Sequence, residues 1–310
     1  MNKKYFNIVI SLIILFFLLE IFNHSNIINN AIINSSKIWF YNIIPSIFPI
    51  YIIVDLLLNY GILDYISNLF KPLMNYIFKM KKQTSFVFIM SMLSGFPSNS
   101  KYIKSLLDNN IINIHDANKL LVFTHFSNPL FIINSIGNNF LNNQKIGIII
   151  LICHYITNII LGFLNRNSYL NLENTYKKVT HKKSSFITTL TNSIFNTIKI
   201  LVLLYGIITV FMIISSVLYT NLPINPFFKS IISGILEITG GIYYVSLLNI
   251  NIIYKASLIT FFISFGGISI HMQVLSILEG YKIKYLDYIK FRLIHAIVST
   301  SLVYTILTLI

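Results

Sequence analysis

Long apolar runs joined by short polar connections fill almost the whole chain. Runs of about 20 residues, the length that crosses a bilayer as a helix, occur at 38–60, 146–164, 200–219, 227–248 and 291–310. A further apolar stretch follows Lys3 and Lys4, and no small-residue cleavage site ends it. We expect this stretch to be a retained first helix rather than a cleaved signal peptide. The pattern predicts an all-α polytopic membrane protein.

One apolar run is too short to cross a membrane. It occupies 85–93 and stops at Ser-Gly-Phe-Pro-Ser-Asn-Ser, residues 94–100, and the chain then resumes as a helical arm over 101–107. Non-helical backbone survives at membrane depth only where protein or a water-filled cavity satisfies its hydrogen bonds. We therefore expect two short arms joined at a polar tip, a re-entrant hairpin near 85–107.

A second interrupted run lies in the other half of the chain. The run at 257–278 is broken by Ser-Phe-Gly-Gly-Ile-Ser-Ile-His at 264–271, and placing Gly95 on Gly266 aligns the two interrupted segments without gaps. Paired segments interrupted by Gly or Pro in two halves of a chain indicate the substrate site of a transporter. We predict an internal repeat, whose orientation in the membrane the sequence leaves undecided. We also predict a second re-entrant hairpin near 257–279 and about seven transmembrane helices.

The composition excludes several classes of protein. Hydrophobic residues make up 55% of the 310 residues and charged residues 10%, whereas a soluble domain has about 25% charged residues. Cys153 is the only cysteine, so no disulfide can form within the chain. The 23 basic residues, against 9 acidic ones, cluster at the ends of apolar runs, as in cytoplasmic loops. None of these clusters forms the folded basic face with aromatic residues that nucleic acid requires, so we expect no nucleic-acid partner.

Polar residues at the first hairpin tip form a candidate substrate site. The tip and the start of the second arm consist of Gly95, Pro97, Ser98, Asn99, Ser100 and Lys101. The amino end of that arm presents free N–H groups and the positive end of the helix dipole, and Lys101 adds a full charge, so the tip suits an anion. The alternative is that Gly and Pro only turn the chain while Lys101 reaches the lipid headgroups. We favour the anion site because a spanning helix needs no break at this position.

The second interrupted segment supplies polar residues without a cation. Gly266 and Gly267 allow close approach of the backbone, and the residues that follow can contact a ligand or hold helices together: Ser269, His271 and Gln273. Ser269 and His271 cannot form a nucleophile–base pair, because residues two apart on a helix point to nearly opposite sides. We expect no catalytic residue and no enzyme activity.

Two positions outside the tips add to the candidate site. Glu237 lies in the middle of 227–248, where a carboxyl group costs about 2.5–3.5 kcal/mol on insertion scales. Proton coupling or pairing with a lysine such as Lys199 would justify that cost, and a hydrogen bond to a neighbouring helix is the alternative. Asn128 precedes Pro129, which breaks a helix and frees carbonyl groups for a substrate or a cation.

Residues that bind metals or nucleotides are not apparent. The histidines have no metal-ligand spacing, and the chain has no Walker A loop and no dinucleotide fingerprint. We therefore expect no metal and no cofactor. By contrast, Asn113 and Asp116 have the spacing of a capping box, which predicts a helix that starts there and runs toward the polar residues at 125–129.

The interrupted segments resemble a known family. Residues 94–101 (Ser-Gly-Phe-Pro-Ser-Asn-Ser-Lys), 128–132 (Asn-Pro-Leu-Phe-Ile) and 264–269 with Gln273 are similar to the YlbJ-type sporulation integral membrane proteins, which carry paired nucleoside-recognition (Gate) domains. The resemblance covers 38–310, although the family usually has Gly-Ala where this chain has Asn-Ser before Lys101. It implies a fold related to concentrative nucleoside transporters, a role in endospore formation, and export of dipicolinic acid from the mother cell across the outer forespore membrane.

The residues and the resemblance together predict four regions. They are an N-terminal membrane helix and loop over 1–37, a first Gate-type repeat over 38–164, a cytoplasmic linker over 165–185 and a second Gate-type repeat over 186–310. We expect a multi-pass protein of the plasma membrane or the outer forespore membrane that transports a small anionic metabolite, dipicolinate by the resemblance. A nucleoside carrier and a structural protein that binds a sporulation membrane-protein partner are the alternatives.

Overall fold

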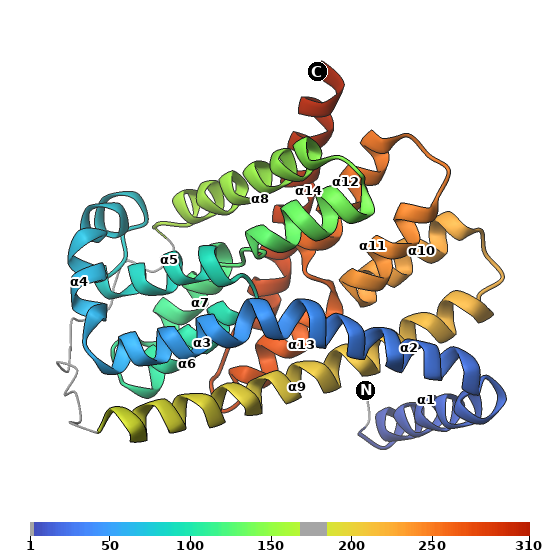
Figure 1. The fold of residues 1–310 in the computed structure, drawn as a ribbon, viewed down its shortest axis with the longest axis horizontal. Helices are drawn as coiled ribbons and strands as arrows, with labels where there is room; N and C mark the ends of the chain where they lie inside the picture. The colour runs from blue at the N-terminus through green and yellow to red at the C-terminus, as the bar shows by residue number, and fades with distance from the viewer. Residues whose placement is uncertain (1–2, 168–184) are drawn as a thin grey trace.

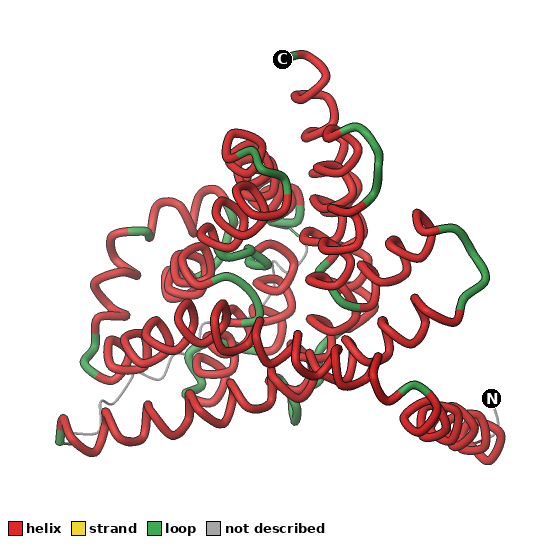
Figure 2. The backbone as a smooth tube through the Cα atoms, turned by 45° about the vertical axis from the view of Figure 1, so that its right-hand side comes forward, coloured by secondary structure: helices red, strands yellow, loops and turns green. Residues whose placement is uncertain are grey.

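The computed structural model describes residues 3–167 and 185–310, and the regular secondary structure in these two ranges is helical (Figures 1 and 2). The first half contains α1 (Lys3–Asn23), α2 (Ser25–Ile38), η1 (Trp39–Ile43), α3 (Ile44–Asn59), α4 (Ile62–Leu69), η2 (Leu73–Ile77), η3 (Lys82–Thr84), α5 (Ser85–Ser94), α6 (Ser98–Asp108), α7 (Ile114–Phe123), η4 (Phe131–Phe140) and α8 (Gln144–Leu164). The second half contains α9 (Phe186–Asn221), α10 (Pro226–Leu236), α11 (Ile238–Leu247), α12 (Ile252–Phe265), α13 (Gly267–Ile277) and α14 (Tyr285–Leu309). The all-α prediction is confirmed, while most of the predicted linker 165–185 lies outside the described residues.

Four helical segments of the described chain are long and apolar enough to cross a membrane. They are Gln144–Leu164, Phe186–Asn221, Ile252–Ile277 and Tyr285–Leu309, the third of which joins α12 and α13 through a bend. Shorter apolar helices occur at Ile14–Asn23, Ile47–Leu57, Pro226–Leu236 and Ile238–Leu247. The predicted number of spans stays a prediction, because these shorter helices cross a bilayer only in combination.

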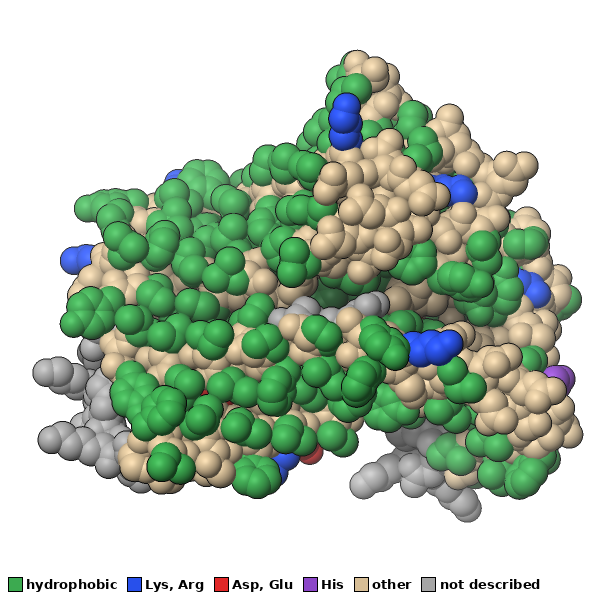
Figure 3. All heavy atoms as spheres, in the orientation of Figure 1, with side chains coloured by type: hydrophobic (Ala, Val, Ile, Leu, Met, Phe, Trp, Pro, Cys, Tyr) green, Lys and Arg blue, Asp and Glu red, His purple; other side chains and the backbone are tan. Residues whose placement is uncertain are grey.

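The outer faces of the long helices are apolar. On α8, Ile148, Ile152, Ile156 and Ile160 recur every four residues and are between 41% and 49% exposed, so they form one stripe along the helix. Hydrophobic side chains cover much of the face in Figure 3, with few charged side chains among them. A surface of this kind is stable in lipid and not in water, so the chain is an integral membrane protein.

The first predicted hairpin is present as two helices that pack on each other. α5 and α6 are joined by residues 95–97, where Gly95 has φ +77°, and Tyr102 Oη of α6 donates a hydrogen bond of 3.0 Å to Ser94 Oγ of α5. α6 begins at Ser98 rather than at Lys101. The polar residues expected at the tip therefore form the first turn of the second arm.

The second hairpin lies at a different place from the predicted one. The run 227–248, expected to be a single span, forms α10 and α11, which pack along each other and turn at Glu237. A Cβ atom on Gly241 would lie 2.1 Å from the Cα atom of Gly234, so the close approach of the two helices requires glycine. The run looks like one span because neither Gly nor Pro marks the turn itself.

The segment expected to be the second hairpin, near 257–279, is a bent helix instead. α12 packs against α14, and α13 packs against α9 and α10 rather than folding back on α12. Gly266 and Gly267 make the bend with φ of +96° and +60°, a conformation that residues with a Cβ atom rarely adopt. The break predicted at these glycines is confirmed, but it redirects the chain without forming a hairpin.

The order of elements favours an alignment of the two halves that differs from the predicted one, and the repeat itself stays a prediction. α5, α7 and α8 begin at residues 85, 114 and 144, and α10, α12 and α14 begin at 226, 252 and 285, in each case about 140 residues later. In this alignment the hairpin α5–α6 is paired with α10–α11, and the break after α7 is paired with the bend after α12. Placing Gly95 on Gly266 compares a hairpin tip with a helix bend.

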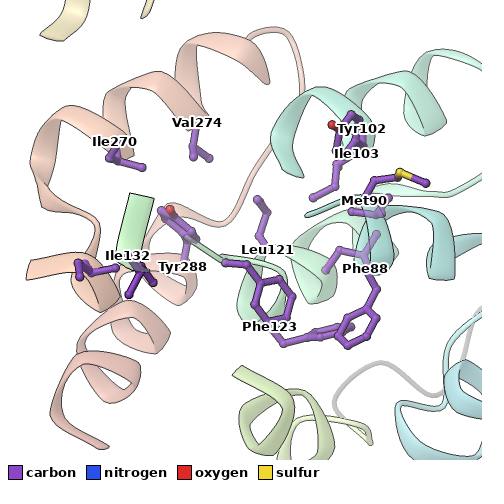
Figure 4. Close-up of a cluster of buried hydrophobic side chains, with 14 of the residues drawn as sticks. Phe88, Met90, Tyr102, Ile103, Leu121, Phe123, Ile132, Ile270, Val274 and Tyr288 are labelled. Carbon is purple, nitrogen blue, oxygen red and sulfur yellow. The ribbon is translucent and has the colours of Figure 1, made fainter. Parts of the chain in front are cut away.

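Both halves contribute to one hydrophobic core. Phe88 of α5 and Ile103 of α6 belong to the same cluster of buried side chains as Val274 of α13 and Tyr288 of α14 (Figure 4). Leu121 and other side chains of α7 lie between them. The core therefore fixes the two hairpins and the two interrupted helices relative to one another.

Candidate functional site

Four interruptions of helices meet near the centre of the molecule. A Cβ atom on Gly95 would lie 2.4 Å from the backbone N of Asn128, and Phe96 N donates a hydrogen bond of 2.6 Å to Phe126 O. These contacts join the first hairpin tip to the break after α7. A Cβ atom on Gly267 would lie 3.3 Å from Ile238, and one on Gly266 would lie 2.8 Å from His125 Nε2. The bend after α12 thus contacts both the second hairpin tip and the first break.

A cavity of about 110 Å³ lies between these interruptions. Its polar lining consists of Ser94, Ser127, Asn128, Glu237, Thr239 and Gln273. The rest of the wall is apolar and includes the aromatic side chains of Phe96 and Phe131 and residues of α2, η1, α3, α9, α11 and α13. A small solute with hydrogen-bonding edges and apolar faces fits a lining of this type.

Some of the predicted site residues line the cavity, and others do not. The predicted residues in the wall are Pro97, Asn128, Glu237 and Gln273. The predicted residues outside it are Gly95, Ser98, Asn99, Ser100, Lys101, Gly266, Gly267, Ser269 and His271. The substrate-binding role of each predicted residue stays a prediction.

Two cavity side chains have buried polar atoms without a hydrogen-bond partner. They are Oγ of Ser127 and Nε2 of Gln273. A buried polar group without a partner costs about 1–3 kcal/mol, so both atoms gain when a solute or a water bonds to them. Asn128 differs, because its Oδ1 already accepts a hydrogen bond of 2.8 Å from Leu130 N.

Lys101 lies away from the cavity and has an acidic partner. Its Nζ is 3.0 Å from Asp55 Oδ1 of α3 and 4.1 Å from the centre of the Tyr51 ring. The lysine is buried, so it does not reach the lipid headgroups either. Its charge is balanced by Asp55, which the sequence analysis did not include in the site. A sequence cannot show this pairing because it depends on the packing of α3 beside the first hairpin.

Glu237 forms the tip of the second hairpin and caps α11. Its carboxylate accepts hydrogen bonds of 2.7 Å from Gly240 N and 2.8 Å from Thr239 Oγ1, and the residue is 3% exposed. Lys199, named above as a counter-charge, is exposed on α9 and forms no ion pair with Glu237. The carboxylate is therefore stabilised by the amino end of α11 and by local donors rather than by a lysine.

His271 has the helix-packing role that the sequence analysis gave as its alternative. Its Nε2 donates to Phe265 O at 2.9 Å, and its Nδ1 lies 3.2 Å from Tyr285 Oη. The first bond satisfies a carbonyl group that the bend at Gly266 leaves outside the helix. Ser269 retains a buried Oγ without a partner, so it remains open to a ligand, as Gln273 does.

A buried Ser–His contact in the core is not a catalytic dyad. His154 Nε2 accepts a hydrogen bond of 3.0 Å from Ser127 N, so the ring proton is on Nδ1, which lies 2.9 Å from Ser264 Oγ. The imidazole therefore donates to Ser264 and cannot take its proton. Among the described residues no group of three or more His, Cys, Asp or Glu side chains is placed to hold a metal ion.

Arg292 is the residue that sequence reasoning missed most clearly. Arg292 lies at the start of an apolar run, where the charge pattern predicts a basic residue of a cytoplasmic loop, but its side chain is fully buried and bonds to Val122 O at the end of α7. Its position within the apolar run of α14 was the available signal, since ionisable residues at membrane depth generally face protein or a cavity.

Comparisons with known proteins show which proteins this chain is similar to. Residues 40–140, which contain the first hairpin and the break after α7, match the Gate family, described as nucleoside recognition. Over 98% of its length the chain is 26% identical to the sporulation integral membrane protein YlbJ of Bacillus subtilis (strain 168), and the match covers 83% of that protein. No solved structure matches the chain. The predicted second Gate-type repeat over 186–310 stays a prediction.

The resemblance inferred from the interrupted segments is confirmed: residues 40–140 match the Gate family, and nearly the whole chain is similar to the sporulation integral membrane protein YlbJ.

Proposed function

We propose that the protein is a carrier that moves a small polar metabolite across a membrane during endospore formation. The observation that carries the proposal is the convergence of two hairpin tips and two helix breaks on one cavity, an arrangement typical of substrate sites in transporters. The name of the Bacillus relative supports the link to sporulation.

Dipicolinate is the first substrate to test, because the family resemblance implies it. Its flat ring fits between apolar walls such as Phe96 and Phe131, and its carboxylate oxygens can accept from Gln273 and Ser127. Glu237 also faces the cavity, and two like charges in a site of low dielectric repel each other. A dicarboxylate is therefore expected to bind together with a proton, carried either by the solute or by Glu237.

A nucleoside is the second candidate, and the description of the matched family favours it. A nucleoside has a flat base for the aromatic wall, and its hydroxyl and N–H groups can donate to Glu237 without the need for a proton. The described cavity lining contains no unpaired cation, so it favours a neutral nucleoside over a dicarboxylate.

The experiment is uptake of labelled dipicolinate and labelled uridine into liposomes that contain the purified protein. We expect uptake of one solute by the wild type, a strong loss in Glu237→Gln and Gln273→Ala, and no loss in Glu279→Gln, which changes an exposed acid outside the cavity. A folded wild type that takes up neither solute would favour the structural role, which a pull-down of membrane partners then tests.

A further inference from the structure

The break after α7 is a place where a transporter is expected to bind a coupling ion. The carboxyl end of a helix carries a partial negative charge and carbonyl groups without partners in the helix. In discontinuous membrane helices such ends and unwound carbonyls coordinate sodium ions or protons. α7 ends at Phe123, and the chain then runs without helical structure as far as Asn128.

Donors of the protein itself occupy the carbonyl groups of this break. Val122 O accepts from the guanidinium of Arg292, His125 O accepts from Asn158 Nδ2 at 2.9 Å, and Phe126 O accepts from Phe96 N at 2.6 Å. These donors come from α14, α8 and the first hairpin tip. The break is thus bonded on three sides by the elements that pack around it.

Arg292 supplies the positive charge at this place. Its residue is 0% exposed, and its second contact, of 3.0 Å, is from Nη1 to His295 Nδ1. His295 Nε2 lies 3.0 Å from His154 O and donates to it, which leaves Nδ1 as an acceptor, so His295 is a neutral partner. No carboxylate in the described chain forms an ion pair with Arg292.

A buried guanidinium without a carboxylate needs another source of negative potential, because an unpaired charge at membrane depth is costly. The carboxyl end of α7 provides it, through Val122 O and the helix dipole. The bond stabilises both partners. The carboxyl end of α7 gains a positive charge, and the guanidinium gains the partial negative charge of the helix dipole.

We propose that Arg292 is the resident cation of the first helix break: its guanidinium takes the place and the charge of a coupling metal ion, and the protein works without sodium. The structural part of this proposal stands on the contacts of Arg292, and the transport part rests on the proposed function.

Thermal unfolding of the purified protein tests the structural part. Arg292→Ala should lower the melting temperature by about 5 °C or more, and methylguanidinium, which can enter the space left by the side chain, should restore part of this loss. Lys290→Ala changes an exposed cation on the same helix. It should leave the melting temperature unchanged, and methylguanidinium should not raise the melting temperature of this variant. Equal melting temperatures for the two variants, or no response of Arg292→Ala to methylguanidinium, would overturn the assignment.

Two measurements on the wild type keep the proposal testable if Arg292→Ala does not fold. The melting temperature should be the same in sodium chloride and choline chloride at equal ionic strength, whereas a rise caused by sodium would contradict a resident cation. Uptake should proceed at the same rate in both salts, and loss of uptake in choline would overturn the transport part. If neither salt permits uptake, the proposed function fails, while the melting data still decide the role of Arg292.

Discussion

The two hairpin tips that meet at the cavity are built differently. The first, between α5 and α6, is held by the neighbouring break, since Phe96 bonds to Phe126 O and Gly95 lies against Asn128. The second, between α10 and α11, is stabilised by contacts within the hairpin itself, which are the approach of Gly234 to Gly241 and the helix cap made by Glu237. The ion pair of the first hairpin, Lys101 with Asp55, lies outside the cavity lining, whereas the second tip places the carboxylate of Glu237 in that lining.

This difference assigns separate tasks to the two hairpins. The Lys101–Asp55 pair joins the first hairpin to α3 and leaves no charge at the cavity. Glu237 leaves a charge there, at the amino end of a helix that stabilises it. If the protein is the carrier proposed above, the first hairpin acts mainly as a support, and Glu237 of the second hairpin determines which charge the solute can have.

The largest expected loss of stability follows from breaking the Lys101–Asp55 ion pair of the first hairpin. Removal of one partner of a buried pair costs about 3–5 kcal/mol, so Lys101→Ala should strongly lower the free energy of unfolding, whereas Lys104→Ala should not. Denaturant unfolding of both variants measures this. The double variant Lys101→Met with Asp55→Leu should recover most of the stability. A Lys101→Ala protein of normal stability that loses solute binding would instead return Lys101 to the substrate site.

A smaller loss of stability is expected from the glycine contact of the second hairpin. A Cβ atom on Gly241 meets backbone, so Gly241→Ala should lower the free energy of unfolding by about 1–3 kcal/mol or more. Gly206→Ala on α9 is the matched control, because a Cβ atom there meets nothing within 4 Å, and it should be neutral or slightly stabilising. Equal stability of the two variants would mean that α10 and α11 do not pack as described.

The smallest effect on stability is expected at Glu237, together with a large effect on transport. Glu237→Ala removes a helix cap, which costs about 1 kcal/mol. Glu237→Gln keeps one acceptor oxygen and removes the charge, so it should be nearly as stable as the wild type.

The pH dependence of uptake shows whether a proton binds together with the solute. If dipicolinate binds together with a proton, uptake by the wild type should rise as pH falls, and the residual uptake by Glu237→Gln should no longer depend on pH. Glu279→Gln should keep it. A wild type whose dipicolinate uptake is independent of pH would favour a neutral solute.

Those features of the site that depend on local signals were predictable from the sequence. The capping box of Asn113 and Asp116 is confirmed, with Asp116 N donating to Asn113 Oδ1 at 2.9 Å, and α7 starts there as predicted. The breaks at Gly95 and Gly266 occur where the sequence predicts them, because glycine is needed for their positive φ angles. Glu237, Asn128 and Gln273 were recognised as polar residues in apolar runs.

Features that depend on contacts between distant residues could not be predicted in this way. The turn at Glu237 requires the approach of Gly234 to Gly241, which a hydropathy pattern does not contain. The partner of Lys101 is Asp55 on another helix, and the partner of Arg292 is a carbonyl group at the end of α7. Identical residue types can thus be a surface charge or a buried structural cation, and only the packing distinguishes them.

The most direct test of the central claim asks whether solute occupies the cavity between the tips and the breaks. A cysteine introduced at Ser127, in a chain with Cys153→Ala, should react with a small thiol reagent, and the transported solute should slow that reaction. A cysteine at Ser301, exposed on α14, is the control and should react at one rate with or without solute. If dipicolinate and uridine both leave the reaction at position 127 unchanged, the cavity is not the solute site.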